Sequence, residues 1–144
     1  MNEKGFTLTE TLFVFSIFLI IASITLINLK PQSTYFTKQL FFSQFKSDLF
    51  YAQQYAISHQ TVIRVNIISD RNYYYIREKF DGQLVLEREF PMDVKVTPGS
   101  MPLYFEISAN GNLNYFGTYF ITIGTDKYRM VFLIGSGRVY VEKE

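Results

Sequence analysis

Two neighbouring residues, Ser58 and His59, are the side chains whose types could form a hydrolytic nucleophile and its base. His59 is the single histidine in the 144 residues. A serine becomes nucleophilic when a histidine accepts its proton through a hydrogen bond, and residues adjacent in the chain seldom adopt that geometry. We therefore interpret His59 as a helix-end residue, and we expect no catalytic residue in this chain.

The sequence contains no strong candidate for a phosphate-binding or a metal-binding site. Residues 135–137 read GSG, but they fall between two predicted strands, and no helix follows to supply a positive dipole. We expect a tight hairpin there. The carboxylates are dispersed along strands without a convergent set for calcium, and the absence of cysteine removes thiolate ligands and disulfides. The sequence predicts no cofactor and no metal site.

Residues 72–79 read NYYYIREK and interleave tyrosines with basic residues. Such a strand could stack single-stranded bases, or it could expose a tyrosine face to neighbouring subunits, because aromatic residues are enriched at protein interfaces. Glu78 and Asp81 reduce its positive charge. The whole chain carries 14 Lys and Arg against 13 Asp and Glu, which leaves no strong electrostatic footprint for nucleic acid. We expect no direct contact with DNA.

An uncharged apolar run from Thr11 to Leu29 dominates the first part of the chain. At about 1.5 Å per residue, a helix of this length spans about 28 Å, close to the hydrocarbon thickness of a bilayer. Its apolar residues contribute roughly 4 to 8 kcal/mol to membrane insertion. A lone carboxylate, Glu10, stands at the front edge. One interpretation is a plain signal anchor, in which Glu10 marks the membrane interface.

The two ends of this run favour a more specific interpretation. After the run, residues 28–31 read NLKP, which contains no small-residue signal-peptidase site, so the apolar helix is expected to remain on the protein. Before it, residues 4–10 read KGFTLTE. This start resembles that of type IV pilins and pseudopilins, whose short basic leader ends in Gly and is followed by Phe, with Glu at the fifth mature position.

The resemblance implies roles for three positions. A membrane prepilin peptidase would cleave between Gly5 and Phe6, and the new amino group of Phe6 would be methylated. Glu10 would pair with that amine and set the axial register of a subunit in the filament. The implied partners are other pilins or pseudopilins of the same filament, the prepilin peptidase and, before assembly, membrane lipid. The implied location is the cell membrane, as a single-pass protein with its C-terminal domain outside, and the cell surface within a pilus.

Residues 31–58 have a second helical pattern. Apolar residues recur at steps of three and four, which places them on one narrow stripe of a helix. The stripe consists of Phe41, Phe45, Leu49, Ala52 and Ala56. Pro31 cannot donate to the helix ladder and disfavours helix at Lys30, so we expect it to kink or restart the helix just outside the membrane.

From Thr61 onward the apolar period changes to two, which predicts half-buried strands. Asp81-Gly82 and Asn110-Gly111 are hairpin signals, and we expect each to link neighbouring strands. Further turns are expected at Pro98-Gly99 and Gly124-Thr125-Asp126. Predicted strands cover 63–67, 84–90, 103–107, 118–123, 128–134 and 138–142, within seven or eight in all. Alternation favours a mostly antiparallel sheet.

The predicted fold is α+β, with a pilin-like long N-terminal helix packed on a mostly antiparallel sheet domain. Its parts are a leader (1–5), a membrane or filament-core helix (6–29), an amphipathic helix (30–60) and a β-rich globular part (61–144), with 30–144 forming one domain.

The C-terminal residues 133–144, LIGSGRVYVEKE, also look like the tail of the competence minor pseudopilins of Gram-positive bacteria. The implied function is a non-enzymatic minor subunit of a competence filament that supports uptake of external DNA. Two alternatives stay open. The Asn110-Gly111 turn and the final Gly-Arg-Val are also similar to the H-type minor pseudopilins of type II secretion or other pilus systems, and a membrane-anchored ligand-binding β-domain would share the apolar helix.

Overall fold

The computed structural model describes residues 7–28, 30–80, 82–133 and 138–144, with side chains described outside 26–35. The chain divides into two compact units, residues 1–36 and residues 37–144. Two long helices occupy the first part of the chain: α1 is Leu8–Asn28 and α2 is Lys30–His59. Helix α2 begins in the first unit and continues into the second, where it becomes part of the globular core.

Helix α2 has the predicted amphipathic character, and all five residues of the expected stripe are buried. The two residues that follow α2 cap its C-terminal end. Gln60 has a left-handed backbone with φ of 51°, and the amides of Gln60 and Thr61 donate to the carbonyls of Ile57 (3.4 Å) and Ala56 (3.2 Å). These two bonds form a Schellman motif, which satisfies carbonyls that would otherwise lack partners at a helix end.

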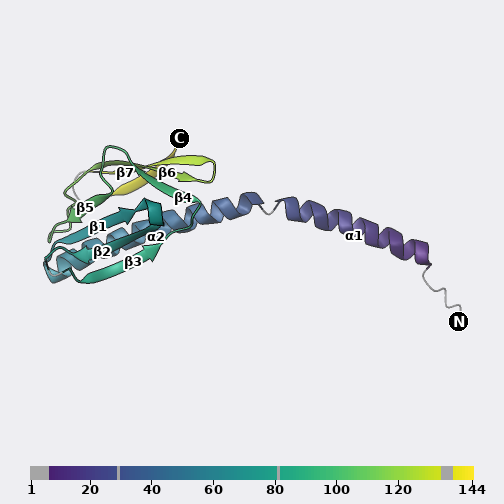
Figure 1. Ribbon diagram of the computed structural model, residues 1–144, viewed down its shortest axis with the longest axis horizontal. Coiled ribbons are helices and arrows are strands. Elements are labelled where there is room, and N and C mark those ends of the chain that lie inside the picture. Colours follow the sequence, from purple (N-terminus) through teal and green to yellow (C-terminus); the bar gives the residue numbers. More distant parts are fainter. Residues whose placement is uncertain (1–6, 29, 81, 134–137) are drawn as a thin grey trace. The chain divides into compact units, whose positions relative to one another are not determined.

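Eight strands and one short 3-10 helix follow in the described residues. The strands are β1 (Ile63–Ile68), β2 (Tyr73–Glu78), β3 (Leu84–Glu89), β4 (Val94–Pro98), β5 (Tyr104–Ile107), β6 (Gly117–Ile123), β7 (Asp126–Phe132) and β8 (Val139–Lys143), and the 3-10 helix η1 is Ser69–Arg71. They form two four-stranded antiparallel sheets. Sheet A has the order β3-β2-β1-β5, and sheet B has the order β4-β6-β7-β8. In Figure 1, β1, β2 and β3 run alongside α2, and β4, β6 and β7 form a second layer.

The core lies between α2 and the inner faces of both sheets. Aromatic rings make the connections: Phe45 of α2 contacts Tyr74 of β2 with centroids 5.0 Å apart, and Phe42 contacts Tyr128 of β7 at 5.4 Å. The sheets also meet directly, because Phe105 of β5 lies 5.8 Å from Phe132 of β7. Each ring buries a large apolar area, so these contacts let a domain without disulfides hold three layers together.

The structure confirms the predicted fold class and the helical stripe, and it gives the expected number of strands. The alternation of apolar residues predicted one mostly antiparallel sheet and did not reveal that the strands divide between two sheets. The Gly82 turn joins the neighbours β2 and β3, and Gly124 joins β6 and β7, each glycine having a positive φ. Residue 81 and the 135–137 hairpin lie outside the described residues.

Two local predictions were wrong. The Asn110-Gly111 turn does not link neighbouring strands, because β5 belongs to sheet A and β6 to sheet B; it closes only an isolated antiparallel bridge, Ile107 to Leu113. The alternation along residues 84–90 predicted that Leu84, Leu86 and Phe90 share one face, but Leu84 does not lie on the inner face with Leu86. A register shift opposite Ile76 and Arg77 inserts an extra residue into β3, so Leu84 is exposed.

Candidate functional site

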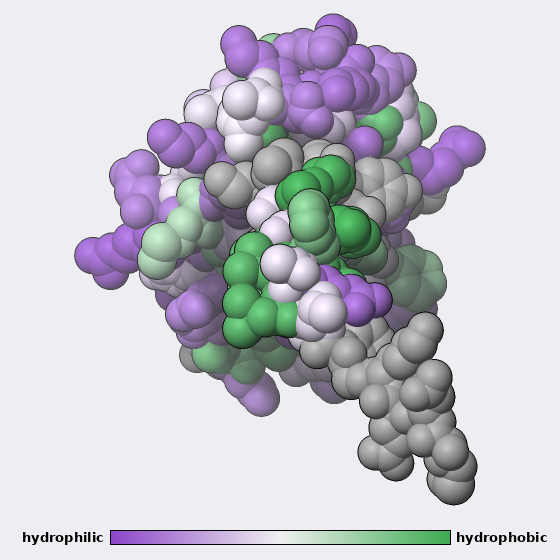
Figure 2. Space-filling view, turned by 90° about the vertical axis from the view of Figure 1, so that its right-hand side faces the viewer, coloured by the Kyte–Doolittle hydropathy of each residue, from purple (hydrophilic) through white to green (hydrophobic). Residues whose placement is uncertain are grey.

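Helix α1 presents an apolar surface that its own chain does not cover. Its large apolar residues from Leu8 to Ile24 are all exposed, including Phe13 at 71% and Ile17 at 56%. Figure 2 shows hydrophobic residues gathered over α1, whereas the surface of the β-rich unit in that view is mostly hydrophilic. The segment Leu8–Thr25 is long and apolar enough to cross a membrane, by length and composition.

Four hydroxyl groups of α1 bond to the helix backbone, and that of Thr9 lies 3.1 Å from the Thr7 hydroxyl. Thr11 donates to the carbonyl of Leu8 at 2.8 Å, and Ser16 donates to that of Leu12 at 2.7 Å. Ser23 and Thr25 make the same kind of bond, to Leu19 and Ile21, at 2.8 and 2.9 Å. Because these polar groups need no outside partner, the helix can enter a nonpolar medium without leaving donors unpaired.

Glu10 is the one ionisable side chain in the α1 sequence, and it lies in the first turn. Thr7 precedes the helix and acts as its N-cap: the Glu10 amide donates to the Thr7 carbonyl at 3.0 Å and approaches the Thr7 hydroxyl at 3.4 Å. A negative charge here also interacts favourably with the helix dipole. The spacing Thr7-x-x-Glu10 is the capping-box signature, a sequence signal that our sequence analysis missed. Glu10 is therefore both the carboxylate singled out above and a helix-start residue.

The other predicted positions of this region have different outcomes. Gly5 and Phe6 lie outside the described residues. Pro31 is the second residue of α2, in the first turn, where a missing backbone N–H costs the helix nothing. The kink at Pro31 stays a prediction.

A buried polar cluster that sequence reasoning missed lies on the inner face of α2. Asp48 is 5% exposed and accepts hydrogen bonds from the Tyr74 hydroxyl at 2.6 Å, from Arg88 Nε at 3.0 Å and from Gln44 Nε2 at 2.9 Å. These donors come from β2, β3 and the preceding turn of α2. Asp48 therefore fixes the position of the helix on sheet A through directional bonds.

The protonation states in this cluster follow from its surroundings. Burial, with the hydrogen bond to Asp48 second, raises the pKa of Tyr74 far above its usual value, so the phenol stays a neutral donor. The hydrogen bond to Asp48 raises the pKa of Arg88, which stays a cation. A carboxylate three residues after Phe45 and four before Ala52, on the apolar stripe, is the signal that could have identified this site.

Ser58 and His59 are closer than we expected. The Ser58 hydroxyl lies 2.9 Å from His59 Nδ1, so the expectation that adjacent residues would not meet was wrong here. The same ring nitrogen lies 3.2 Å from the Tyr55 carbonyl, and the ring stacks on that of Tyr55 with centroids 3.9 Å apart. The serine hydroxyl also donates to the Tyr55 carbonyl at 3.1 Å. Both side chains thus bond to the last turn of α2, which supports the helix-end interpretation.

The described part of the chain contains no metal site. No group of three His, Asp or Glu residues there is arranged to hold an ion. The charged clusters that do occur are ion pairs on the surface of the sheets, such as Glu106 with Arg64 and Lys79, each at 2.7 Å. Hydrogen bonds from Lys79 first and then Arg64 hold the pKa of Glu106 below its usual value.

Comparison with known proteins connects these features. The family described as "Prokaryotic N-terminal methylation motif" matches residues 1–26. The competence protein ComGD of Bacillus subtilis is 30% identical over 143 residues, which cover 99% of this chain and 96% of that protein.

Two solved structures share the fold. The type IV minor pilin FimU of Pseudomonas aeruginosa has a TM-score of 0.56 at 17% identity, covering 69% of this chain and 88% of FimU. The minor pseudopilin EpsH from the type 2 secretion system of Vibrio cholerae has a TM-score of 0.55 at 12% identity, covering 73% of this chain and 95% of EpsH. At these identities the likeness concerns the fold. The match to ComGD along nearly the full length, with the methylation motif at the start, shows that this chain belongs to the ComGD family.

Proposed function

We propose that this chain is a minor pseudopilin of a competence filament and that it supports the uptake of external DNA. The observation that carries the proposal is the uncovered apolar helix α1, which bears Glu10 as its one ionisable group and precedes a folded α+β unit. Membership of the ComGD family supports the competence role, and the folds of FimU and EpsH support a minor-subunit role.

In this function, the apolar surface of α1 lies first in the membrane and then inside the filament. Before assembly, α1 spans the membrane once, with the β-rich unit outside the cell. After the prepilin peptidase cleaves between Gly5 and Phe6, and Phe6 is methylated, α1 moves into the filament, where apolar helices of other pilins or pseudopilins replace lipid. Both environments are apolar, and the hydroxyls of Thr11, Ser16, Ser23 and Thr25 need no new partner during the transfer, because they already bond to the helix backbone.

Glu10 sets the axial register of the subunit in the filament during this transfer. A carboxylate near hydrocarbon is costly unless a cation pairs with it, and the amino group of Phe6 created by cleavage is such a cation. The pair gains most where water is scarce. Glu10→Val should leave insertion and cleavage intact but strongly reduce incorporation into filaments, and Glu10→Asp should cause a smaller loss. Glu10→Gln keeps a side chain that can complete the capping box, so it separates the charge from helix capping.

Fractionation combined with intact mass tests the proposal. Membrane content, the mass of the mature N-terminus and the amount of protein in sheared surface material should be measured together for the native chain, Glu10→Val, Glu10→Gln and Gly5→Val. We expect a chain that starts at methylated Phe6 and appears in the sheared material, and an uncleaved chain for Gly5→Val, because a Cβ crowds the approach of the peptidase to the backbone. A native chain found only in membranes would instead indicate a membrane-anchored ligand-binding domain.

A further inference from the structure

A groove lies between α2 and β8 in the globular unit, and the proposed function does not use it. It consists of two cavities, of about 450 and 340 Å³, that both contact Lys46. Along α2 it extends from Lys38 to Ile57, which is about 28 Å at a rise of about 1.5 Å per residue. We call it the α2–β8 groove and define it by Lys46, Leu49, Phe50 and Ile57 of α2 and by Val139 and Val141 of β8.

The Asn110-Gly111 turn forms a wall of the groove near Ile57. Gln53 Nε2 donates to the Gly111 carbonyl at 3.1 Å, which ties the turn to α2. Gly111 has a φ of 82°, and a Cβ at this position would lie only 2.8 Å from Ile57 Cδ1. Glycine therefore lets the turn pack directly on the helix. A turn that joins no neighbouring strands thus has a structural role, because it fixes one wall of the groove.

Strand β8 is an edge of sheet B among the described residues, and it borders the groove with its open side. The Glu144 amide donates to the Lys127 carbonyl at 3.0 Å. Hydrogen-bonded pairs alternate along an antiparallel ladder, so the even-numbered residues of β8 bond to β7. The other N–H and C=O groups of β8 point away from β7, have no hydrogen-bond partner in the described part of the chain, and belong to residues that line the groove: Val139, Val141 and Lys143.

The end of the groove beside Val139 exposes apolar side chains. Phe50 is 63% exposed there and Ile57 is 40% exposed, although both belong to the helix that packs on the two sheets. Leu49 and Val139 extend this apolar lining. Because covering apolar surface removes it from water, this end favours a partner that brings apolar side chains.

The end of the groove beside Val141 is basic. Lys38, Lys46 and Lys143 line it, and none of the described lining residues is a carboxylate. Asp126 lies outside the lining and bonds to Lys143 at 2.8 Å. The ion pairs of the described residues include neither Lys38 nor Lys46. This end therefore has an excess of positive charge, which favours acidic groups on a partner.

We propose that the α2–β8 groove binds an extended segment of another protein chain, which adds to β8 as a fifth strand of sheet B. The open edge of β8 offers both N–H donors and C=O acceptors, and a polypeptide backbone supplies partners for both. The phosphate groups of lipids or nucleic acids could accept from the N–H groups and bind the lysines, but they have no donor for the carbonyls. The groove-facing side chains of the segment are acidic beside Val141 and apolar beside Val139.

The pairing rules of the sheet determine how the segment lies. Sheet B is antiparallel throughout, and antiparallel pairs are slightly more stable than parallel ones. An antiparallel segment begins with its acidic part beside Lys143 and ends with its apolar part beside Val139. Residues directly opposite one another lie on the same face of a sheet, so the residues that bond to Val139 and Val141 also face the groove. In the proposed function a neighbouring filament subunit supplies the segment, and only this source rests on that function.

The probe for this site is a fluorescent synthetic peptide with glutamates in its first half and valines in its second half, each followed by threonine. Its binding to the full chain in detergent micelles is measured by fluorescence anisotropy. Methylation of the backbone nitrogens of the glutamates and valines should weaken binding at least about tenfold, because these N–H groups bond to β8. Methylation of the threonine nitrogens, which face solvent, should keep binding within about threefold. A peptide with lysine in place of glutamate should bind at least about tenfold more weakly.

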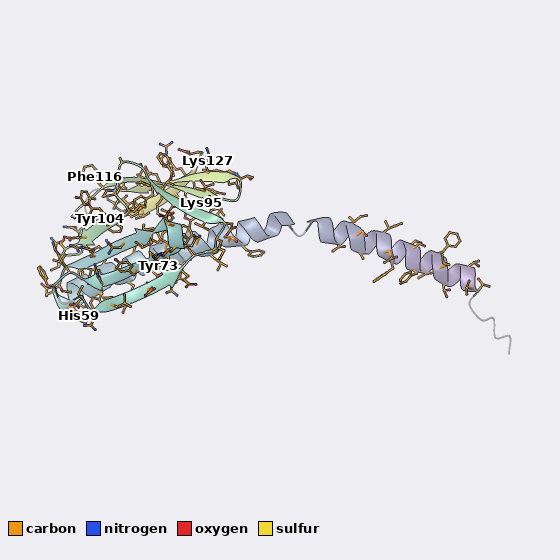
Figure 3. All side chains as sticks on the ribbon, in the orientation of Figure 1. His59, Tyr73, Lys95, Tyr104, Phe116 and Lys127 are labelled. Carbon is orange, nitrogen blue, oxygen red and sulfur yellow. The ribbon has the colours of Figure 1, made fainter. Side chains whose placement is uncertain are left out.

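Charge removal on the protein tests the basic end of the groove. Lys38→Gln combined with Lys46→Gln should weaken binding of the unmethylated peptide about threefold to tenfold, as expected for two partly exposed ion pairs. The matched control is Lys95→Gln with Lys127→Gln, which removes the same charge from exposed positions on β4 and β7; Figure 3 labels both lysines. The control should leave binding unchanged, and thermal unfolding should show that both double variants are folded.

The proposal is overturned if the native chain does not bind the peptide, if the two methylated peptides bind equally well, or if the two double variants have equal effects. It is also overturned if oligothymidine or short-chain phosphatidylglycerol displaces the probe at a lower concentration than the unlabelled peptide does, because the groove would then be a phosphate site. The assay uses no filament. A failed peptide assay therefore leaves the filament role intact, and a native chain absent from sheared surface material leaves this site intact.

Discussion

Helices α1 and α2 are both long and rich in phenylalanine, but their apolar residues have opposite environments. The side chains of Phe13, Phe15 and Phe18 in α1 are more than 60% exposed, whereas those of Phe41, Phe42 and Phe45 in α2 are at most 7% exposed. Helix α2 obtains its cover from the two sheets that follow it in the chain. Helix α1 obtains none from the described residues, and in the proposed function lipid and then other subunits cover it.

The polar groups of the two helices follow the same division. In α1, the hydroxyls of Thr11, Ser16, Ser23 and Thr25 donate to the backbone of the helix itself. In α2, the buried carboxylate of Asp48 takes its partners from the sheet as well as from its own helix. A helix that changes its surroundings must satisfy its polar groups internally, while a helix that keeps one partner can use those groups to fix its position.

The largest expected effect comes from placing charges on the uncovered helix. Ile17→Arg combined with Ile20→Arg should abolish membrane insertion, because each arginine at the centre of a span costs about 2.5 to 3.5 kcal/mol against a total gain of roughly 4 to 8. The measurement is the amount of protein that remains with membranes after an alkaline wash. The matched control is Leu40→Arg with Phe50→Arg on the exposed side of α2, which should leave membrane content unchanged.

The next effect concerns the covered helix. Phe45→Ala removes a ring that is 3% exposed and contacts Tyr74, so it should lower the free energy of unfolding by about 3 to 5 kcal/mol through lost burial and a cavity. Phe50→Ala, at a residue 63% exposed, should change it by less than about 0.5 kcal/mol. Thermal unfolding followed by tyrosine circular dichroism measures both. Equal losses would mean that the α2 stripe does not form the core in solution.

The spacing of apolar residues in the sequence predicted much of the difference between α1 and α2. The apolar run of α1 and the stripe of α2 are local patterns with distinct spacing, and alternation marked most of the strands. The pairing of strands into two sheets was not predictable, because it depends on contacts between residues far apart in the sequence. The exposure of Leu84 depends on one extra residue in β3, which the alternating pattern conceals.

Polar residues in apolar surroundings were the second source of error. Asp48 lies among residues that the stripe places in the core, and only the bonds from Tyr74 and Arg88 show why a carboxylate is tolerated there. The place of Glu10 in the first turn of α1 was readable from the capping-box spacing Thr7-x-x-Glu10, whereas its role in assembly stays a prediction. For Asp48, the residue type was visible in the sequence, but its partners on β2 and β3 were not.

An intermediate effect tests the role of Asp48. Asp48→Ala should cost about 2 to 3 kcal/mol of stability, because it leaves the buried Tyr74 hydroxyl unpaired, while Arg88, 41% exposed at its side chain, can still reach water. Asp48→Asn retains an acceptor and should cost less. Arg88→Gln should cost least of the three. Unfolding in urea would measure this order, and a larger loss for Arg88→Gln than for Asp48→Ala would contradict the assignment of Asp48 as the centre of the cluster.

The smallest expected effect comes from removing α1. A fragment of residues 33–144 keeps the whole globular unit, and because α2 takes its cover from the sheets, the fragment should fold as a monomer and unfold within about 0.5 kcal/mol of the full chain. Both proteins should be measured in the same detergent, so that only the presence of α1 differs.

The variant Phe45→Ala sharpens the test, since its loss of about 3 to 5 kcal/mol should be the same in the fragment and in the full chain if the two units are energetically independent. A fragment with the circular dichroism spectrum of an unfolded chain, or a Phe45→Ala effect that shrinks when α1 is removed, would show that the apolar helix stabilises the globular unit and that the two helices are not as separate as their exposure indicates.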